Sequence, residues 1–433
     1  MSAGLANSIP FDPADPRTSL GVLPEAPGIF ALCAADPAAE PYLSKTPNLR
    51  RRLMRFLRGP AAADAAGREA PRTRRLQLAH MVHHIEYSVT GSEFESSLCL
   101  YEASLRAFGE RARKRLRLRP PTFLRMSIDN AYPRVYATAK ISKTAARALF
   151  GPFPSRTAAE RYADEMLNLF LLRRCFEDLD PDPAFPGCVY SEMKMCLAPC
   201  YKGCSDERYK EESAAVFDFL STRGASLLAK LEGERNAASE AMEFERAASI
   251  HQRMQKVQAV AHLASEAIRP LSQLSGILVQ PSGELDHVAL FALSCGVWSG
   301  PVPYSILGMR LANERSGSSS LFAHPFALEA VPLEAPSAQP SKDLLEARLE
   351  QALSALAQSS PKSVPSQTLS DHLALFKQWF YRPAARSTGE MVFAGVEGEM
   401  PRKPLLRAIS RVAARAISTD PKELAKPPIQ WHA

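Results

Sequence analysis

Cysteines are the residues of this 433-residue chain whose types and spacing point most clearly to chemistry. Five of the eight cysteines fall between Cys175 and Cys204, where even scatter would place fewer than one. The first four are separated by twelve, seven and three residues: Cys175, Cys188, Cys196 and Cys200. Prolines and glycines between them bend the backbone, so that four thiolates can converge. In a cytoplasmic protein, four thiolates suit a zinc ion or an iron–sulfur cluster.

The spacing leaves alternatives open. Structural zinc sites prefer two tight CxxC-like pairs, and the wide first gaps match that pattern poorly. Free cysteines with a structural role are the other interpretation. Cys204 follows Cys200 after three residues and is either a spare thiol or an alternative ligand.

A second set of residues could act on a phosphodiester. Tyr42, Lys45 and Arg52 lie within eleven residues of one another, where a strand pair runs into a helix. Cleavage needs a base for the attacking water, a cation on the phosphate and a carboxylate that holds a divalent metal such as Mg²⁺. The plain alternative is a solvated basic helix face beside a surface tyrosine. Three neighbouring histidines, His80, His83 and His84, have no cysteine or carboxylate at ligand spacing and predict no metal site.

Basic charge is concentrated in the first third of the chain, and the formal net charge is +7. Arginine binds phosphate in a bidentate manner, so two arginine-rich runs favour contact with nucleic acid over a merely solvated surface. The first run includes Arg58, and both are predicted to supply DNA contacts through Arg50, Arg51, Arg55, Arg113, Arg115 and Arg117.

Hydrophobic periodicity, turn residues and capping residues predict the helices and strands that position these side chains. Residues 28–33 and 41–44 predict a strand, a turn and a strand, and Asn48 predicts the start of a helix. Residues 72–85 have helical periodicity and lead into a strand at 85–89. Ser92 with Glu95 is a capping box, which predicts a long helix towards Arg119.

The remaining chain predicts an α+β protein with several units. We expect a helix within 151–175, two long helices over 206–268 joined near 241–243, and a hairpin from 276–279 and 288–293. Further helices are expected at 342–358 and 366–380. No apolar run reaches the length of a membrane helix and no signal peptide opens the chain, so we expect a cytoplasmic protein.

Three motifs, in order, resemble those of the UvrC family of excinucleases. PGIFAL followed by PYLSKTPNLRRRLMRFL is similar to the family's GIY-YIG nuclease start. FGPFPSR, LFLLRRC and CLAPCYKGC are similar to the family's cysteine-containing segment. FERAA is similar to the signature of the UVR module, a helical hairpin through which UvrB and UvrC pair.

The resemblance implies a role for each matched residue. It makes Tyr42 the base, Lys45 and Arg52 the cations and Glu102 the Mg²⁺ ligand of a nuclease. It implies a 4Fe–4S cluster on Cys175, Cys188, Cys196 and Cys200, with zinc as the alternative. It also implies docking of a UvrB-like protein through Phe244, Glu245, Ala247 and Ala248.

The chain also departs from the family. Phe30 replaces the first motif tyrosine, Ser44 a glycine and Phe123 an asparagine. After Pro301 the sequence has no RNase H-like or helix-hairpin-helix signature. The expected function is therefore DNA binding in nucleotide excision repair with one metal-dependent incision. The alternatives are an inactive adaptor and an iron–sulfur sensor that binds DNA.

The expected organisation has five parts. Their order is a flexible tail over 1–16, a nuclease-like domain over 17–125, a linker with the cysteine-rich region over 126–205, a UVR hairpin over 206–266, and a C-terminal region of unknown role over 267–433.

Overall fold

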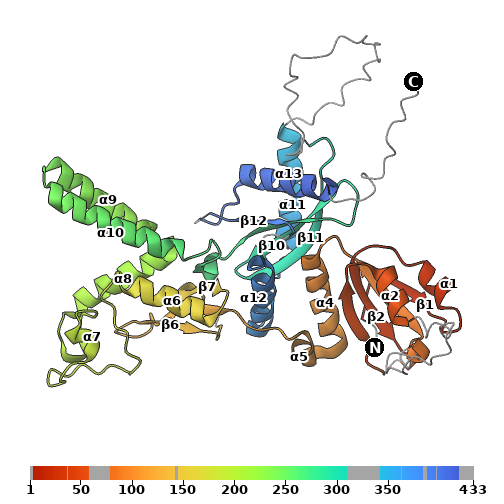
Figure 1. Ribbon diagram of the computed structural model, residues 1–433, viewed down its shortest axis with the longest axis horizontal. Coiled ribbons are helices and arrows are strands. Elements are labelled where there is room, and N and C mark those ends of the chain that lie inside the picture. The colour runs from red at the N-terminus through yellow and green to blue at the C-terminus, as the bar shows by residue number, and fades with distance from the viewer. Residues whose placement is uncertain are drawn as a thin grey trace, which may run out of the picture.

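The computed structural model describes residues 3–36, 38–57, 79–141, 145–309, 342–361, 363–383, 388–395 and 397–418. Within these residues, helices surround three four-stranded antiparallel sheets, which confirms the predicted α+β class (Figure 1). Arg58 and the predicted helical segment 72–78 lie outside the described residues. None of the helices in the described ranges is long and apolar enough to cross a bilayer.

The first sheet has the strand order β1-β4-β2-β3. The predicted strand pair is confirmed as β2 (Gly28–Cys33) and β3 (Tyr42–Thr46), and the next predicted strand as β4 (His84–Val89). Helices α1 (Pro16–Gly21) and α2 (Leu49–Leu57) cover one face. A flexible tail was predicted over residues 1–16. The prediction is wrong for Asn7–Pro10, because these residues form strand β1, which pairs with β4.

Helix α4 (Glu93–Phe108) joins the first sheet to the rest of the molecule (Figure 1). Ser92 caps it as predicted, since its side chain accepts a hydrogen bond from the Glu95 N–H at 3.1 Å. The helix does not continue to Arg119, because Gly109 adopts φ +56° and the chain restarts in the short helix α5 (Ala112–Leu116). A glycine at this position ends a helix without the strain that a Cβ atom would cause.

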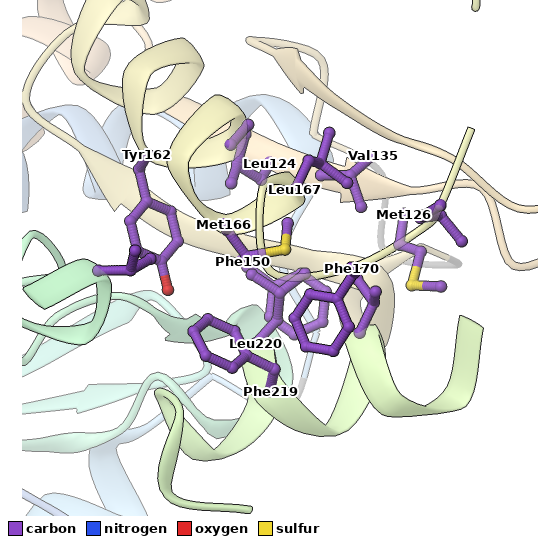
Figure 2. Packing of buried hydrophobic residues seen from close by; sticks show 14 of the residues in the cluster. Leu124, Met126, Val135, Phe150, Tyr162, Met166, Leu167, Phe170, Phe219 and Leu220 are labelled. Atoms are coloured by element: carbon purple, nitrogen blue, oxygen red, sulfur yellow. The ribbon is translucent and has the colours of Figure 1, made fainter. Parts of the chain in front are cut away.

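The second sheet has the order β6-β5-β7-β8, with β5 Thr122–Met126, β6 Val135–Thr138, β7 Leu149–Phe153 and β8 Arg269–Pro270. Helix α6 (Arg156–Leu167) is shorter than the predicted helical stretch. Figure 2 shows its side chains Met166 and Leu167 packed with Phe150 of the sheet and Phe219 of a later helix. This buried core corrects the predicted linker over 126–205, much of which is a folded domain.

Three helices, rather than the two predicted, follow the cysteine-rich region. They are α8 (Asp206–Thr222), α9 (Ala225–Glu240) and α10 (Phe244–His262). The predicted break near 241–243 is confirmed. The additional break falls at Arg223 and Gly224. Arg223 caps the end of α8 with a φ of +53°, and Gly224, with a φ of +87°, precedes the first residue of α9.

The third sheet has the order β11-β10-β9-β12. The predicted hairpin is β9 (Gly276–Pro281) and β10 (His287–Ser294), and the two predicted helices are α11 (Lys342–Ser359) and α12 (Ser366–Phe380). The sequence analysis missed β11 (Val297–Ser305), β12 (Glu390–Phe393) and α13 (Arg402–Ser418). Helices α11 and α13 pack on one face of this sheet, while α12 and α4 pack on the other.

Candidate functional site

The cysteine-rich region follows α6 and folds into irregular loops around the short helix α7 (Val189–Glu192). These loops bring four thiols close enough to influence one another. Burial is the main reason that the pKa of the Cys196 thiol is raised to about 11, and the thiols of Cys175, Cys200 and Cys188 add to it. Burial also raises the pKa of Cys200, with contributions from Cys188 and Cys175.

Cys204 has a different environment from these four thiols. Its pKa is raised by burial and then by the Asp206 carboxylate, whereas Arg208 acts in the opposite direction. The fold therefore distinguishes the fifth cysteine from the four predicted ligands.

Two donors approach the sulfur atoms. The Ala198 N–H donates to Cys196 Sγ at 3.3 Å, and Arg173 Nη1 donates to Cys175 Sγ at 3.6 Å. Arg173 is only 1% exposed and is held by the carbonyl oxygens of Tyr132 and Glu177, each at 2.8 Å. Sequence reasoning missed Arg173, although an arginine inside the apolar segment LFLLRRC is a signal of a buried, paired charge.

The sulfur positions can be compared with what each metal needs. A tetrahedral zinc ion with Zn–S bonds of about 2.3 Å holds its sulfur ligands about 3.8 Å apart. Among the described residues, no three of Cys175, Cys188, Cys196 and Cys200 have sulfur atoms within 4.8 Å of one another. The four sulfur atoms are thus grouped, but they are spaced more widely than the ligands of one zinc ion.

The predicted nuclease residues divide into two groups. Tyr42 is 42% exposed, and its ring lies 5.6 Å from that of Phe56 on α2. The Arg52 guanidinium lies 5.7 Å from the centre of the same ring. Tyr42 and Arg52 therefore share the α2 side of the first sheet. Phe30, which replaces the motif tyrosine, is buried in the core beneath them.

Lys45 lies on the other side of the sheet. Its ammonium group contacts Glu93 Oε1 at 3.1 Å and Ser97 Oγ at 2.8 Å, both on α4. Glu102 is nine positions after Glu93, which at about 100° per residue turns it about half a turn away around the helix. Glu102 is exposed, and its carboxyl pKa is raised because neighbouring atoms partly desolvate it, while Arg106 opposes that shift. The structure brings Tyr42 to Arg52 and Lys45 to Glu93, but it does not bring the four predicted residues together.

Half of the arginines predicted to contact DNA are bound within the chain. Arg50 donates to the Leu23 carbonyl at 2.6 Å and to Glu25 at 2.9 Å. Arg113 donates to the buried Asp371 carboxylate at 2.7 Å.

Arg115 pairs with Glu40, and its guanidinium lies 4.0 Å from the Phe108 ring centre. Arg50, Arg113 and Arg115 thus have partners inside the fold, and DNA contact by them stays a prediction. Arg51, Arg55 and Arg117 are exposed, and none has an ion pair with a described residue.

The hairpin of α9 and α10 projects away from the sheets (Figure 1). At its tip, Met242 is 77% exposed and Phe244 is 67% exposed. Glu245 and Ala248 are also exposed, and Ala247 is half-buried. The base of the hairpin is buried. Four of its side chains pack in the core of the second sheet: Leu231, Met254, Val257 and Val260. The predicted docking residues thus lie at the exposed tip, where the apolar Met242 and Phe244 stand beside the charged Glu245.

Comparison with known proteins finds two segments of this chain that match family models. Residues 122–219 match the model of the UvrC/Cho excinuclease middle domain, and residues 225–260 match the UvrB/uvrC motif. A UvrABC system protein C from Moorella thermoacetica is 28% identical over 252 residues, or 57% of this chain and 38% of that protein. Its counterpart in Carboxydothermus hydrogenoformans is 27% identical over 290 residues, or 66% of this chain and 45% of that protein.

No solved structure matches the chain. The chain spans about two fifths of the length of the curated relatives it matches, from 38% to 45% for the two described above. The middle domain corresponds to β5–β7, α6, the cysteine loops and α8, and the motif corresponds to the projecting hairpin. The chain therefore contains a segment similar to the UvrC/Cho excinuclease middle domain, followed by a UvrB/uvrC motif.

Proposed function

We propose that this protein is a DNA-binding component of a nucleotide excision repair excinuclease that docks a UvrB-like partner and does not itself cut DNA. The observation that carries the proposal is the projecting α9–α10 hairpin, which matches the UvrB/uvrC motif and presents the apolar side chains of Met242 and Phe244 to solvent. The curated relatives are proteins of the UvrABC system, which supports the same role.

Docking through the hairpin tip is the test of this function. Replacing Phe244 by Ala removes an exposed aromatic anchor of the kind that dominates protein interfaces, and we expect affinity for a purified UvrB protein to fall at least about tenfold. Isothermal titration of the full chain measures the change. Leu285→Ala is the matched control, because Leu285 is 87% exposed on a loop far from the hairpin in sequence. Equal affinity of the wild type and Phe244→Ala contradicts the proposed docking.

The DNA interface is proposed for the arginines that the fold leaves exposed. A variant with three alanine substitutions, at Arg51, Arg55 and Arg117, should bind duplex DNA more weakly. The slope of log K against log salt concentration should also become smaller, because fewer phosphate charges are neutralised. Fluorescence anisotropy at several salt concentrations measures both. The charge-loss control also removes three arginines that are exposed on other units, Arg161, Arg253 and Arg407. A loss no larger than that of the control rejects this interface.

Two observations favour binding without incision. Tyr42 and Arg52 lie on the opposite face of the first sheet from Lys45, and Phe30 has no hydroxyl group. A metal-dependent single incision is the competing function. Incubation of damaged duplex with Mg²⁺ and the wild type, Tyr42→Phe or Glu102→Gln decides between them. We expect no cleavage above that of the two variants, whereas cleavage that only the wild type supports assigns the nuclease function instead.

A 4Fe–4S cluster is proposed on Cys175, Cys188, Cys196 and Cys200. The Ala198 N–H and the buried Arg173 guanidinium are aimed at two of the sulfur atoms, as charge-assisted donors to thiolate ligands. When bound, such a cluster ties these loops together and supplies a one-electron couple. Anaerobically purified protein should have broad visible absorption that Cys196→Ser removes and Cys204→Ser retains. A colourless protein with tightly bound zinc rejects the cluster.

If the cluster is a redox sensor, DNA affinity changes on its oxidation, whereas a structural cluster only lowers stability when it is removed.

A further inference from the structure

Three side chains of the first sheet form a second group with the donor chemistry of a metal site. Cys33, His84 and Glu86 each offer one ligand atom, and these atoms all lie within 4.8 Å of one another. Cys33 Sγ is 3.9 Å from Glu86 Oε1, and His84 Nε2 is 3.6 Å from the same oxygen. Among the described residues, this is the one group of three or more cysteine, histidine and acidic side chains that meets this distance limit.

The strand register produces this arrangement. Cys33, the last residue of β2, pairs directly with His84, the first residue of β4. Glu86 pairs with Ala31, so Cys33 and Glu86 are diagonal neighbours, and all three side chains point to the same face because alternate residues of a strand share a face. Sequence analysis considered His84 only with its neighbours His80 and His83. The partners of His84 come from a strand about fifty residues earlier and from its own strand two residues later.

Burial makes a bound cation favourable here. Cys33 is 4% exposed and Glu86 is 5% exposed, so a thiol and a carboxylate share an environment with little water. The Leu5 N–H donates to Glu86 Oε2 at 3.3 Å, which leaves Oε1 as the oxygen nearest to the sulfur and the imidazole. A divalent cation between these atoms neutralises the negative charges of the carboxylate and of a coordinating thiol, which binds as the thiolate.

We propose that Cys33, His84 and Glu86 bind a zinc ion. In a tetrahedral zinc site the bonds to sulfur, nitrogen and oxygen are about 2.0 to 2.3 Å, which places the ligand atoms about 3.3 to 3.8 Å apart. The observed separations of 3.9 Å and 3.6 Å are within a few tenths of an ångström of that range. A mixed sulfur, nitrogen and oxygen donor set is typical of zinc rather than of magnesium or calcium.

Three protein ligands leave the fourth zinc position for a water molecule. The His84 side chain is 34% exposed, so solvent reaches the site from that side. A site with three protein ligands and a water is of the open type, unlike the four-thiol centre of the middle domain. The zinc site lies in the first sheet and does not depend on the proposed repair function.

Zinc content and ligand type in the full chain test the proposal. Wild type, His84→Asn and Cys33→Ser are equilibrated with Zn²⁺, freed of excess by gel filtration and measured by inductively coupled plasma mass spectrometry. The four middle-domain cysteines are intact in all three proteins, so their contribution cancels in the difference. We expect the wild type to hold one more zinc per chain than either variant. Zinc-edge X-ray absorption difference spectra should show one sulfur and two or more nitrogen or oxygen ligands.

Cys99→Ser is the matched control, because Cys99 is a half-buried cysteine of the adjacent α4 and is not part of the group. It should retain the wild-type zinc content. His84→Asn replaces a partly exposed side chain and keeps the fold if Cys33→Ser does not. Equal zinc content in the wild type and His84→Asn, or a loss of zinc in Cys99→Ser as large as in Cys33→Ser, overturns the proposal.

Discussion

His372 on α12 is a buried histidine that the fold keeps neutral. It is 8% exposed, and burial lowers its pKa to about 4. Its Nδ1 accepts a hydrogen bond from the Trp298 N–H at 2.9 Å, which places the ring proton on Nε2. The residue therefore connects α12 to β11 only while the imidazole is uncharged.

The stability of this region should depend on pH because of His372. The folded pKa of about 4 is below the unfolded value of 6.5, so the unfolded state binds a proton first as the pH falls. The contribution is complete above pH 6.5 and is lost between pH 6.5 and pH 4. From pH 7 to pH 5 we expect the free energy of unfolding to fall by about 2 kcal/mol.

Urea unfolding monitored by tryptophan fluorescence at both pH values measures this loss, since Trp298 and Trp379 lie in the same core. His372→Asn is the comparison, because its side-chain oxygen can accept the Trp298 N–H but does not titrate. A decrease from pH 7 to pH 5 that is as large in His372→Asn as in the wild type shows that other groups cause it.

Among the elements, the break between α8 and α9 is made by two left-handed residues, Arg223 and Gly224. Gly224 has a φ of +87°, a backbone conformation that is costly for residues with a Cβ atom. A Cβ atom there would also lie 3.2 Å from Ala261 Cβ and 3.2 Å from the Phe219 ring. The glycine, together with Arg223, thus helps to set the direction in which the α9–α10 hairpin leaves α8.

Gly224→Ala should destabilise the protein by about 1 to 3 kcal/mol, because the left-handed backbone and the close contacts are both unfavourable. Calorimetry of the full chain measures the effect. Gly233→Ala is the matched control, since Gly233 lies within α9 with no neighbouring atom within 4 Å of an added Cβ, and alanine favours a helix. An unchanged or higher unfolding temperature in Gly224→Ala contradicts this account of the break.

At the scale of the whole molecule, α4 belongs to two units at once. Phe94 packs in the core of the third sheet, with its ring 4.7 Å from that of Trp298, while Ala107 and Phe108 pack against Leu43 of the first sheet. The chain also approaches itself closely at Gly91, where an added Cβ atom would lie 2.3 Å from the backbone of Ser282. The first and third sheets are therefore held together by direct contacts.

An ion-pair group strengthens this junction. Glu93 accepts from both terminal nitrogens of Arg382, at 2.5 Å and 2.8 Å, and from Lys45 at 3.1 Å. Arg382 first and Lys45 second hold the pKa of Glu93 at about 2, below its usual 4.5. Because the folded pKa is depressed, the contribution to stability is present above pH 4.5 and is lost as the pH falls from 4.5 to 2.

Arg382→Ala should lower the unfolding temperature at pH 7, and the difference from the wild type should shrink below about pH 4.5. The effect is modest, since the pair is partly solvated. Differential scanning calorimetry from pH 7 to pH 3 measures it. Arg402→Ala is the control, because Arg402 pairs with Glu350 inside the C-terminal unit. If the difference in unfolding temperature between the wild type and Arg382→Ala does not change below pH 4.5, the stabilising interaction of Arg382 does not depend on ionised Glu93.

The sequence by itself determined the local elements and the order of the motifs. Strand patterns, the Ser92 cap and the boundaries of α11 and α12 were predictable because periodicity, capping and turn residues act over a few positions. The cysteine spacing and the FERAA motif were recognisable for the same reason, since both are local, and the roles assigned to them stay predictions.

Only the tertiary structure decided which side chains meet. Arg113 was predicted to bind phosphate, but the fold places Asp371, more than 250 positions later, against its guanidinium. Lys45 and Tyr42 are three positions apart, yet the pleat of a strand sends them to opposite faces of the sheet. Cys33 and Glu86 meet because β2 pairs with β4. Long-range pairing is set by the burial of whole faces, and no local pattern records it.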